Sequence, residues 1–326
     1  MKSLLYSKKI HYNSEIDYEE VAKIINDVFL ERVNIDSVQY LSVGRINKIF
    51  KIKLSNSNIE NVILREKIRK NKIQEILHRE ERIHQKLFEN GINNFAKIYY
   101  QNYKKGYCLQ QYIEGQNLNY EYKNKDLYKI GCLLSRIHSI KVNVDDEIVN
   151  DNEKLLFEDI DRYYKRYFRC VLDDANNKFP NLIAKAKKLI EKLYVDNLYD
   201  ESDISIVHHD FHALNVITNN ENIYLIDWES ARLDVSEVEF VKFKHLNIPQ
   251  LSNEQINSFL KGYQKYKILK KTSNFVCHEI IWLVKMYVFE TDNPIKNHIY
   301  FPSREYYYDQ IMSIYYKFFN GKEEEI

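Results

Sequence analysis

The chain has 326 residues, of which 44% are hydrophobic, and it carries 48 basic against 47 acidic side chains. This length and apolar content suffice for a large core and for two lobes of ordinary domain size. A formal net charge of +1 argues against a general nucleic-acid-binding protein, since such proteins carry a clear basic excess.

Neither export nor a membrane span is expected from the sequence. The first residues hold no apolar stretch long enough for a signal peptide, and the longest apolar window, residues 280–289, is interrupted by Lys285. The four cysteines lie inside apolar patterns without the paired spacing of metal ligands, which predicts buried, reduced thiols. The protein is therefore expected in the cytoplasm.

Charge is distributed unevenly along the chain. Residues 1–115 carry 20 Lys and Arg against 14 Asp and Glu, whereas the remainder carries 28 against 33. A basic first part suits a polyphosphate ligand, and an acidic second part suits a cationic one. Solvated faces also carry such imbalances, so this pattern is a weak indication.

Residues 1–115 are predicted to begin with a helix and to continue as a small antiparallel sheet. An amphipathic helix is expected over 18–33, and two extended runs then flank a turn at Gly44, with Asn47 just beyond it. Taken alone, Gly44 indicates an ordinary hairpin turn.

A third strand ends in two cations, Arg65 and Lys67, which the strand period of two places on the same face. The charged helix predicted over 73–90 then carries Glu80 in an apolar stripe, with Glu81 beside it. A carboxylate in such a stripe needs a partner, and a solvated surface position is the alternative. The sequence leaves open which cation pairs with which carboxylate.

Two further strands follow, and the second runs into Gln111, Tyr112 and Ile113, which a plain strand-to-helix connection would also explain. Residues 116–326 are then predicted to be mainly helical. The acidic stretch 145–161 and the two helices after it would suit a cationic ligand, although a solvated helix face is the default interpretation of such acids.

Three side chains suited to metal and proton chemistry fall between short apolar runs: Asp210, Asn215 and Asp227. A hairpin predicted after Asn215 would return Asp227 beside it. Phosphoryl transfer needs groups that align an attacking hydroxyl and hold Mg²⁺ against phosphate oxygens. Singly, each of the three would more often be a turn or capping residue, so it is their combination that indicates function.

The pattern His208-x-Asp210-x-x-x-x-Asn215, followed by Ile-Asp227-Trp-Glu, resembles the catalytic and metal-binding loops of the aminoglycoside phosphotransferase and choline kinase superfamily. That superfamily shares its fold with protein kinases. The resemblance implies ATP and Mg²⁺ as cofactors, Asp210 as the catalytic base and His208 as a residue that orients the loop. It implies Asn215 and Asp227 as the magnesium ligands.

The resemblance also implies a bilobal α+β fold, with an antiparallel-sheet N-lobe over 1–115 and a mainly helical C-lobe over 116–326. In the N-lobe, Gly44-x-x-Asn47 is similar to a loop whose backbone amides approach the phosphates. The family pairs a strand cation with a helix glutamate to hold the α and β phosphates, which indicates Arg65 and Glu80, with Lys67 and Glu81 as substitutes. The junction that binds adenine would be formed by Gln111, Tyr112 and Ile113.

The expected function is ATP-dependent phosphotransfer to a hydroxyl of a small, cationic molecule. An aminoglycoside-like acceptor is the leading candidate because of the Asp-Phe-His-x-x-Asn form. Choline or ethanolamine is the second candidate because of the Gly-x-x-Asn-x-x-Phe and Leu-Arg forms. The third alternative is a catalytically silent binding or structural protein. Relatives usually carry Asp where Val238 or Glu239 stands, which weakens detailed transfer of a substrate. No nucleic-acid or membrane partner is expected.

Overall fold

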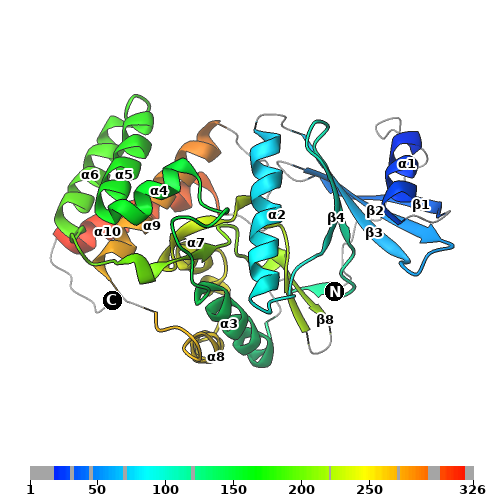
Figure 1. Cartoon of the computed structure of the whole chain (residues 1–326). Coiled ribbons are helices and arrows are strands. Elements are labelled where there is room, and N and C mark those ends of the chain that lie inside the picture. Colours follow the sequence, from blue (N-terminus) through cyan, green and yellow to red (C-terminus); the bar gives the residue numbers. More distant parts are fainter. Residues whose placement is uncertain are drawn as a thin grey trace. The chain divides into compact units, whose positions relative to one another are not determined.

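The computed structural model describes residues 18–29, 33–43, 47–68, 72–118, 122–219, 222–269, 272–292 and 302–319. The chain forms two compact units, coloured along the sequence in Figure 1: unit 1 comprises residues 1–116 and 217–230, and unit 2 comprises 117–216 and 231–326. The predicted turn residue Gly44 lies outside the described residues.

Unit 1 is built on a five-stranded antiparallel sheet with the strand order β1-β2-β3-β5-β4. Within it, Leu64 lies opposite Leu109, and Arg65 lies opposite Cys108. The strands of this sheet are β1 (Asn34–Val43), β2 (Asn47–Ser55), β3 (Asn61–Lys67), β4 (Ile98–Asn102) and β5 (Tyr107–Gln111).

The two helices of unit 1, α1 (Tyr18–Phe29) and α2 (Ile73–Glu89), pack against different sets of strand side chains. Leu64 and Leu109 join the core cluster beneath α1, whereas Cys108 packs with α2, because successive strand residues point to opposite faces of a sheet. Arg65 follows Leu64 and therefore points to the face that α2 covers, which positions it for a partner on that helix.

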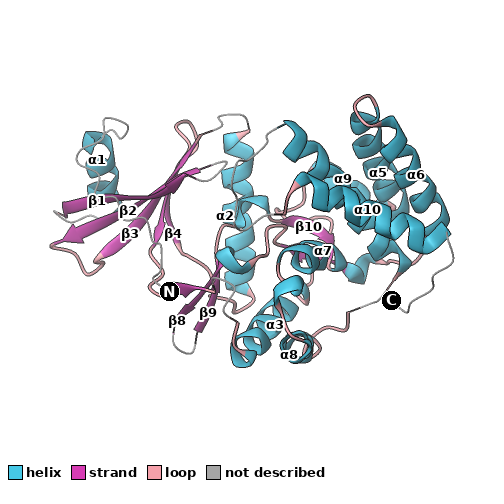
Figure 2. Ribbon diagram, turned by 180° about the vertical axis from the view of Figure 1, so that it is seen from behind, coloured by secondary structure: helices cyan, strands magenta, loops and turns pink. Residues whose placement is uncertain are grey.

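Unit 2 is mainly helical, as Figure 2 shows. Helix α9 packs against α5, α6, α7 and α10 and is buried along most of its length, which explains why its sequence is apolar nearly all round. The helices of unit 2 are α3 (Asn124–His138), α4 (Asp151–Glu158), α5 (Ile160–Asn176), α6 (Pro180–Leu193), α7 (Glu237–Leu246), α8 (Asn253–Tyr263), α9 (Ser273–Asp292) and α10 (Arg304–Phe319).

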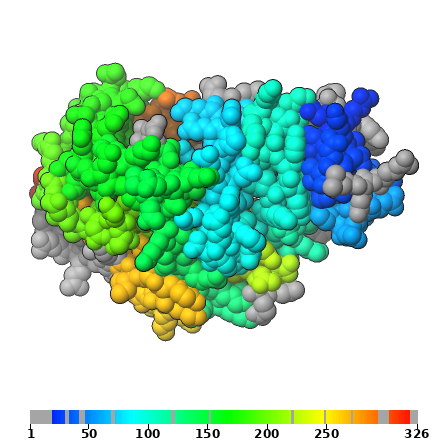
Figure 3. Space-filling model, viewed as in Figure 1, coloured from blue at the N-terminus to red at the C-terminus, as the bar shows by residue number. Residues whose placement is uncertain are grey.

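Helices α3 and α8 make the most extensive helix pair of this unit and lie side by side in Figures 1 and 2. Their backbones approach closely at Gly131 and Gly262, where a side chain of any size would collide with backbone atoms of the facing helix. Helices α4, α5 and α6 also pack together, and their green atoms form one continuous surface in Figure 3.

Short strands occupy the stretches that lead to and from the candidate site. Strand β7 (Ile204–Val207) is fully buried and pairs antiparallel with β10 (Arg232–Val235) in unit 2. Strands β6 (Gln116–Asn117), β8 (Val216–Asn219) and β9 (Asn222–Leu225) form a separate sheet in the order β6-β8-β9. Strands β8 and β9 occupy the positions of the predicted hairpin.

The α+β class predicted from the sequence is confirmed, with an antiparallel-sheet unit and a mainly helical unit. Within the described ranges, no helix combines the length and the apolar character that crossing a lipid bilayer requires.

Candidate active site

The loop that carries Asp210 leaves the buried strand β7 through a constrained turn. His209 has φ of +60°, which is uncommon for a residue other than glycine. Its Nε2 lies 3.2 Å from Oδ2 of Asp234 on β10, the strand paired with β7. Burial lowers the pKa of His209 to about 4, so the imidazole is neutral near pH 7 and this contact is not an ion pair. The turn is therefore fixed from the neighbouring strand.

The backbone of the same loop is held by Glu239 of α7. Oε2 of Glu239 accepts a hydrogen bond from the His208 N–H at 2.6 Å, and Oε1 accepts one from the His209 N–H at 3.2 Å. Burial alone would raise the pKa of Glu239, but the neighbouring side chains of His138, His208 and His209 outweigh burial, and the pKa falls below its ordinary value. An ionised carboxylate on α7 thus holds the backbone of this loop.

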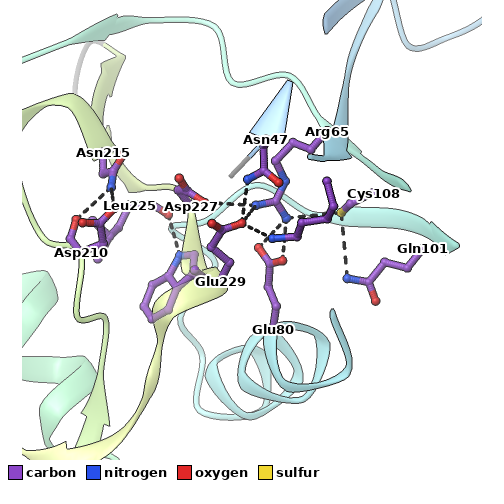
Figure 4. A network of polar contacts seen from close by, with 12 residues as sticks. Asn47, Arg65, Glu80, Gln101, Cys108, Asp210, Asn215, Leu225, Asp227 and Glu229 are labelled. Carbon is purple, nitrogen blue, oxygen red and sulfur yellow. Dashed lines mark hydrogen bonds and ion pairs between the residues drawn. The ribbon is translucent and has the colours of Figure 1, made fainter. Parts of the chain in front are cut away.

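The Asp210 carboxylate is contacted from several sides. The Nδ2 of Asn215 donates to Oδ2 and to the backbone oxygen of Asp210, both at 2.9 Å (Figure 4). Lys242 of α7 contacts Oδ1, and His212 Nε2 lies 3.6 Å from Oδ2. Burial would raise the pKa of Asp210, but Lys242 and His212 reverse this and hold it far below its ordinary value. With its side chain 25% exposed, Asp210 is an ionised and accessible acceptor.

His208 lies against the Asp210 backbone. Its Nδ1 accepts a hydrogen bond from the Asp210 N–H at 3.2 Å, while its own N–H is bound by Glu239. The ring is almost completely buried. The predicted role of His208 in orienting the loop stays a prediction.

Asn215 presents a free amide oxygen. Among the described residues, all of its side-chain hydrogen bonds use Nδ2, so Oδ1 is available as a ligand. Amide and carboxylate oxygens are the ligands that Mg²⁺ takes in proteins, so Asn215 fits such an ion. The part of the chain that the structure describes holds no group of three His, Cys, Asp or Glu side chains that could bind a metal by themselves.

In unit 1, Arg65 and Glu80 form a buried ion pair (Figure 4). The Nη2 of Arg65 lies 2.6 Å from both oxygens of Glu80, and Cys108 Sγ lies 3.4 Å from the same nitrogen. Burial opposes both charges, but their mutual attraction outweighs it, so the pKa of Arg65 is raised and the pKa of Glu80 is lowered. Glu81 instead accepts a hydrogen bond from the Tyr103 hydroxyl at 2.6 Å.

Two carboxylates of the segment after β9 meet the cations of β3. Asp227 has φ of +65°, and its Oδ1 lies 3.3 Å from Arg65 Nη1. Glu229 contacts Lys67 and accepts a hydrogen bond from Asn47 Nδ2 at 2.7 Å. Glu229 also lies 4.0 Å from Arg65 Nη1, so the two cations share this carboxylate, whereas Glu80 and Asp227 contact Arg65. Asn47, predicted to lie near the nucleotide phosphates, binds Glu229.

The segment that carries Asp227 is anchored to unit 1 by hydrogen bonds. The backbone oxygen of Asn94 accepts from the Leu225 N–H at 2.8 Å, and Asn94 Nδ2 donates to the Ile223 oxygen at 2.7 Å. Trp228 is buried, and its Nε1 donates to the Leu225 oxygen at 2.8 Å. Asn215 belongs to unit 2 and Asp227 to unit 1, so their joint binding of a metal stays a prediction.

The predicted adenine-binding junction lies at the end of β5. The N–H of Gln111 donates to the Lys97 oxygen at 2.8 Å and is therefore engaged within the sheet. The Tyr112 ring lies under the Lys51 ammonium group, whose nitrogen is 3.9 Å from the ring centroid, and Ile113 is buried.

Three contributors to these contacts were not identified from the sequence: Lys242, Glu229 as the partner of Lys67, and Glu239 as the anchor of the loop. Spacing offered some signal, since Glu229 lies two residues beyond Asp227 and Lys242 lies three beyond Glu239, on the same face of a helix. Their partners lie between 30 and 162 residues away in the sequence, however.

Comparison with solved structures gives the class of fold. Spectinomycin phosphotransferase APH(9)-Ia, solved with ADP and spectinomycin, matches with a TM-score of 0.61 and 16% identity, over 93% of this chain and 98% of that one. LicA in complex with AMP matches at 0.60 and 15%, over 92% and 98%. The ethanolamine kinase of Plasmodium vivax matches at 0.59 and 16%, over 98% and 94%. The chain thus has the protein-kinase-like fold of the small-molecule phosphotransferases.

Comparison of sequences gives the family. Residues 38–280 match the model of the choline/ethanolamine kinase family, and the chain belongs to that family. Among characterised proteins, the LicA homolog of Metamycoplasma hominis is 27% identical over 177 residues. That match spans 53% of this chain and 62% of the relative, which is less than two thirds of its length.

Proposed function

We propose that this protein is a kinase that transfers the γ-phosphoryl group of ATP to a hydroxyl group of a small, cationic acceptor. The observation that carries the proposal is the Asp210–Asn215 arrangement, an ionised and partly exposed carboxylate beside an amide whose oxygen is available to a metal. In phosphoryl transfer the protein mainly positions the reactants and stabilises charge, and such a carboxylate accepts the proton of the attacking hydroxyl.

On the nucleotide side, the Arg65–Glu80 pair supports a phosphate-binding role for Arg65. A guanidinium held by a buried carboxylate keeps one orientation, and its remaining N–H groups can bind phosphate oxygens. Gly44 and Asn47 would form the loop over the phosphates. Because the N–H of Gln111 is engaged, adenine recognition at the junction would fall to Tyr112 and Ile113.

Magnesium would be bound by Asn215 and Asp227. The free Oδ1 of Asn215 and the Asp227 side chain, which is 32% exposed, support this assignment. When bound, the ion would neutralise charge on the phosphate oxygens.

For the acceptor, the family match over 38–280 favours choline or ethanolamine. An aminoglycoside is the second candidate, supported by the shared fold of the spectinomycin phosphotransferase and by the Asp-Phe-His-x-x-Asn form of the loop. Both classes join a hydroxyl to a positive charge, so one chemistry would serve either.

The test is an ADP-release assay with purified protein, ATP and Mg²⁺, offering choline, ethanolamine, spectinomycin and gentamicin in parallel. We expect ADP release that depends on one of these acceptors, and we expect D210N to lower it by at least about a hundredfold, a typical loss for a general base. A thermal shift with ATP and Mg²⁺ should remain in D210N. Binding of ATP without turnover on any acceptor would favour the catalytically silent alternative.

A further inference from the structure

Lys242 stands at the candidate catalytic carboxylate without any role assigned so far. It lies on α7, one helical turn after Glu239, and residues three apart share a face of a helix. Glu239 binds the backbone of the Asp210 loop, and Lys242 contacts Oδ1 of Asp210 itself. The same helix face therefore holds both the backbone of the loop and its carboxylate.

The contact is more enclosed than ordinary surface ion pairs. The Lys242 side chain is 17% exposed and that of Asp210 is 25% exposed, whereas the Lys187–Asp173 pair of the same unit is 40% and 56% exposed. Exposed ion pairs of that kind contribute little to the stability of the fold, because water screens the charges and both side chains stay mobile.

Both oxygens of the carboxylate have a donor. Lys242 contacts Oδ1, and Asn215 Nδ2 donates to Oδ2 at 2.9 Å, so the plane of the Asp210 carboxylate is fixed from two directions. Each oxygen of a carboxylate can accept more than one hydrogen bond, so an acceptor hydroxyl can still donate to it.

We propose that Lys242 is a positioning residue for phosphoryl transfer, which orients Asp210 toward the acceptor hydroxyl and places a positive charge beside the reacting groups. This inference rests on the proposed kinase function. In the reaction, the acceptor oxygen bonds to the γ-phosphorus, the bond from that phosphorus to the β–γ bridging oxygen breaks and ADP leaves. The hydroxyl proton passes to Asp210.

The first test compares kcat and KM of K242M and K242R with the acceptor identified in the ADP-release screen. We expect K242M to lower kcat by about tenfold to a hundredfold while the KM for ATP changes by less than about threefold, since the lost interaction acts in the transition state. K242R should restore part of kcat. The control K187M removes the exposed lysine–aspartate pair of the same unit and should keep normal kinetics.

A kcat for K242M within about twofold of the unmodified protein, or a K242R variant as impaired as K242M, would overturn the proposal. A merely structural lysine would lower thermal stability without this separation of kcat from KM.

The second test needs no turnover and so separates this inference from the kinase proposal. Urea unfolding is measured for the unmodified protein, K242M, D210N and the double variant. If Lys242 acts through Asp210, K242M shifts the urea midpoint in the unmodified background and shifts it clearly less in D210N. Equal shifts in both backgrounds would overturn the inference at the contact itself. Coupling without ADP release on any acceptor would confirm that Lys242 acts through Asp210 and would overturn the kinase function on which its catalytic role rests.

Discussion

The Oε2 of Glu239 lies 2.6 Å from the backbone nitrogen of His208, so a carboxylate on α7 holds the loop that carries Asp210. Glu239 also accepts from the His209 N–H, and replacement by alanine would leave two enclosed N–H groups without their acceptor. We expect E239A to lower the free energy of unfolding by about 3 kcal/mol, measured by urea denaturation. E239Q keeps one side-chain carbonyl oxygen as an acceptor, so it should lower the free energy of unfolding by less than E239A does. Equal stability of E239A and the unmodified protein would contradict this role.

The proposed metal ligands make a prediction about magnesium. Removing Mg²⁺ with a chelator should abolish transfer, and N215A and D227N should each raise the Mg²⁺ concentration for half-maximal turnover. We expect at least about a tenfold increase, because replacing even a residue that only supports the metal ligands typically lowers metal affinity by about tenfold or more. Titration of Mg²⁺ at saturating ATP provides the measurement. An unchanged magnesium requirement in either variant would remove that residue from the ligand set.

Arg65 and Lys67 lie on the same face of β3 and both lie near Glu229, but Arg65 also binds both oxygens of Glu80, which separates their expected roles. R65K keeps the charge but loses the two-pronged geometry that binds carboxylates and phosphates. We therefore expect R65K to weaken ATP binding by about tenfold, measured by calorimetry, and K67M to weaken it less. The opposite ranking would make Lys67 the phosphate-binding cation.

The Arg65–Glu80 pair predicts a pH dependence of stability. Burial alone would raise the pKa of Glu80 above its ordinary value of 4.5, but Arg65 outweighs it and lowers the pKa. A lowered pKa in the folded state stabilises the protein above the pKa of the unfolded chain, and this contribution is lost as pH falls through the folded value. We expect E80Q to lower the free energy of unfolding by about 3 kcal/mol at pH 7.

The destabilisation of E80Q should begin to diminish below about pH 4.5, where the unfolded chain takes up a proton at Glu80, and it should be lost fully only below the lowered pKa of the folded state. Urea denaturation of both proteins from pH 7 down to the lowest pH at which both still fold measures the difference. E81Q is the matched control, because Glu81 lies on the same helix and its one hydrogen bond among the described residues goes to an exposed tyrosine hydroxyl. A deficit that persists unchanged in acid would contradict the ionic origin.

Local patterns were sufficient to predict much of this fold. Apolar spacing placed the helix over 73–90, which is α2, and turn residues placed the hairpin of β8 and β9 after Asn215. The loop motif marked His208, Asp210 and Asn215, which the structure joins by hydrogen bonds. In these segments the interactions are short in sequence, so composition and spacing carry the information.

The remaining contacts depend on tertiary packing. Glu80 and Glu81 are neighbours on one helix, and only the position of α2 over the sheet decides which of them meets Arg65. Lys242 is one of 48 basic residues, and its spacing of three from Glu239 indicates its helix face but not its partner. Partners separated by 32 residues, as here, are fixed by how a helix packs against a loop.

Unit 1 is discontinuous in the sequence, because residues 217–230 complete it although residues 117–216 intervene. A fragment that stops at residue 116 would lack Asp227 and Glu229, and the basic groups of Arg65 and Lys67 would lose the carboxylates they face in the intact chain. Neither unit therefore corresponds to one contiguous stretch of sequence that could be expressed or exchanged by itself. Truncated variants and chimaeras should keep residues 217–230 together with the N-terminal sheet, or connect these residues to it by circular permutation.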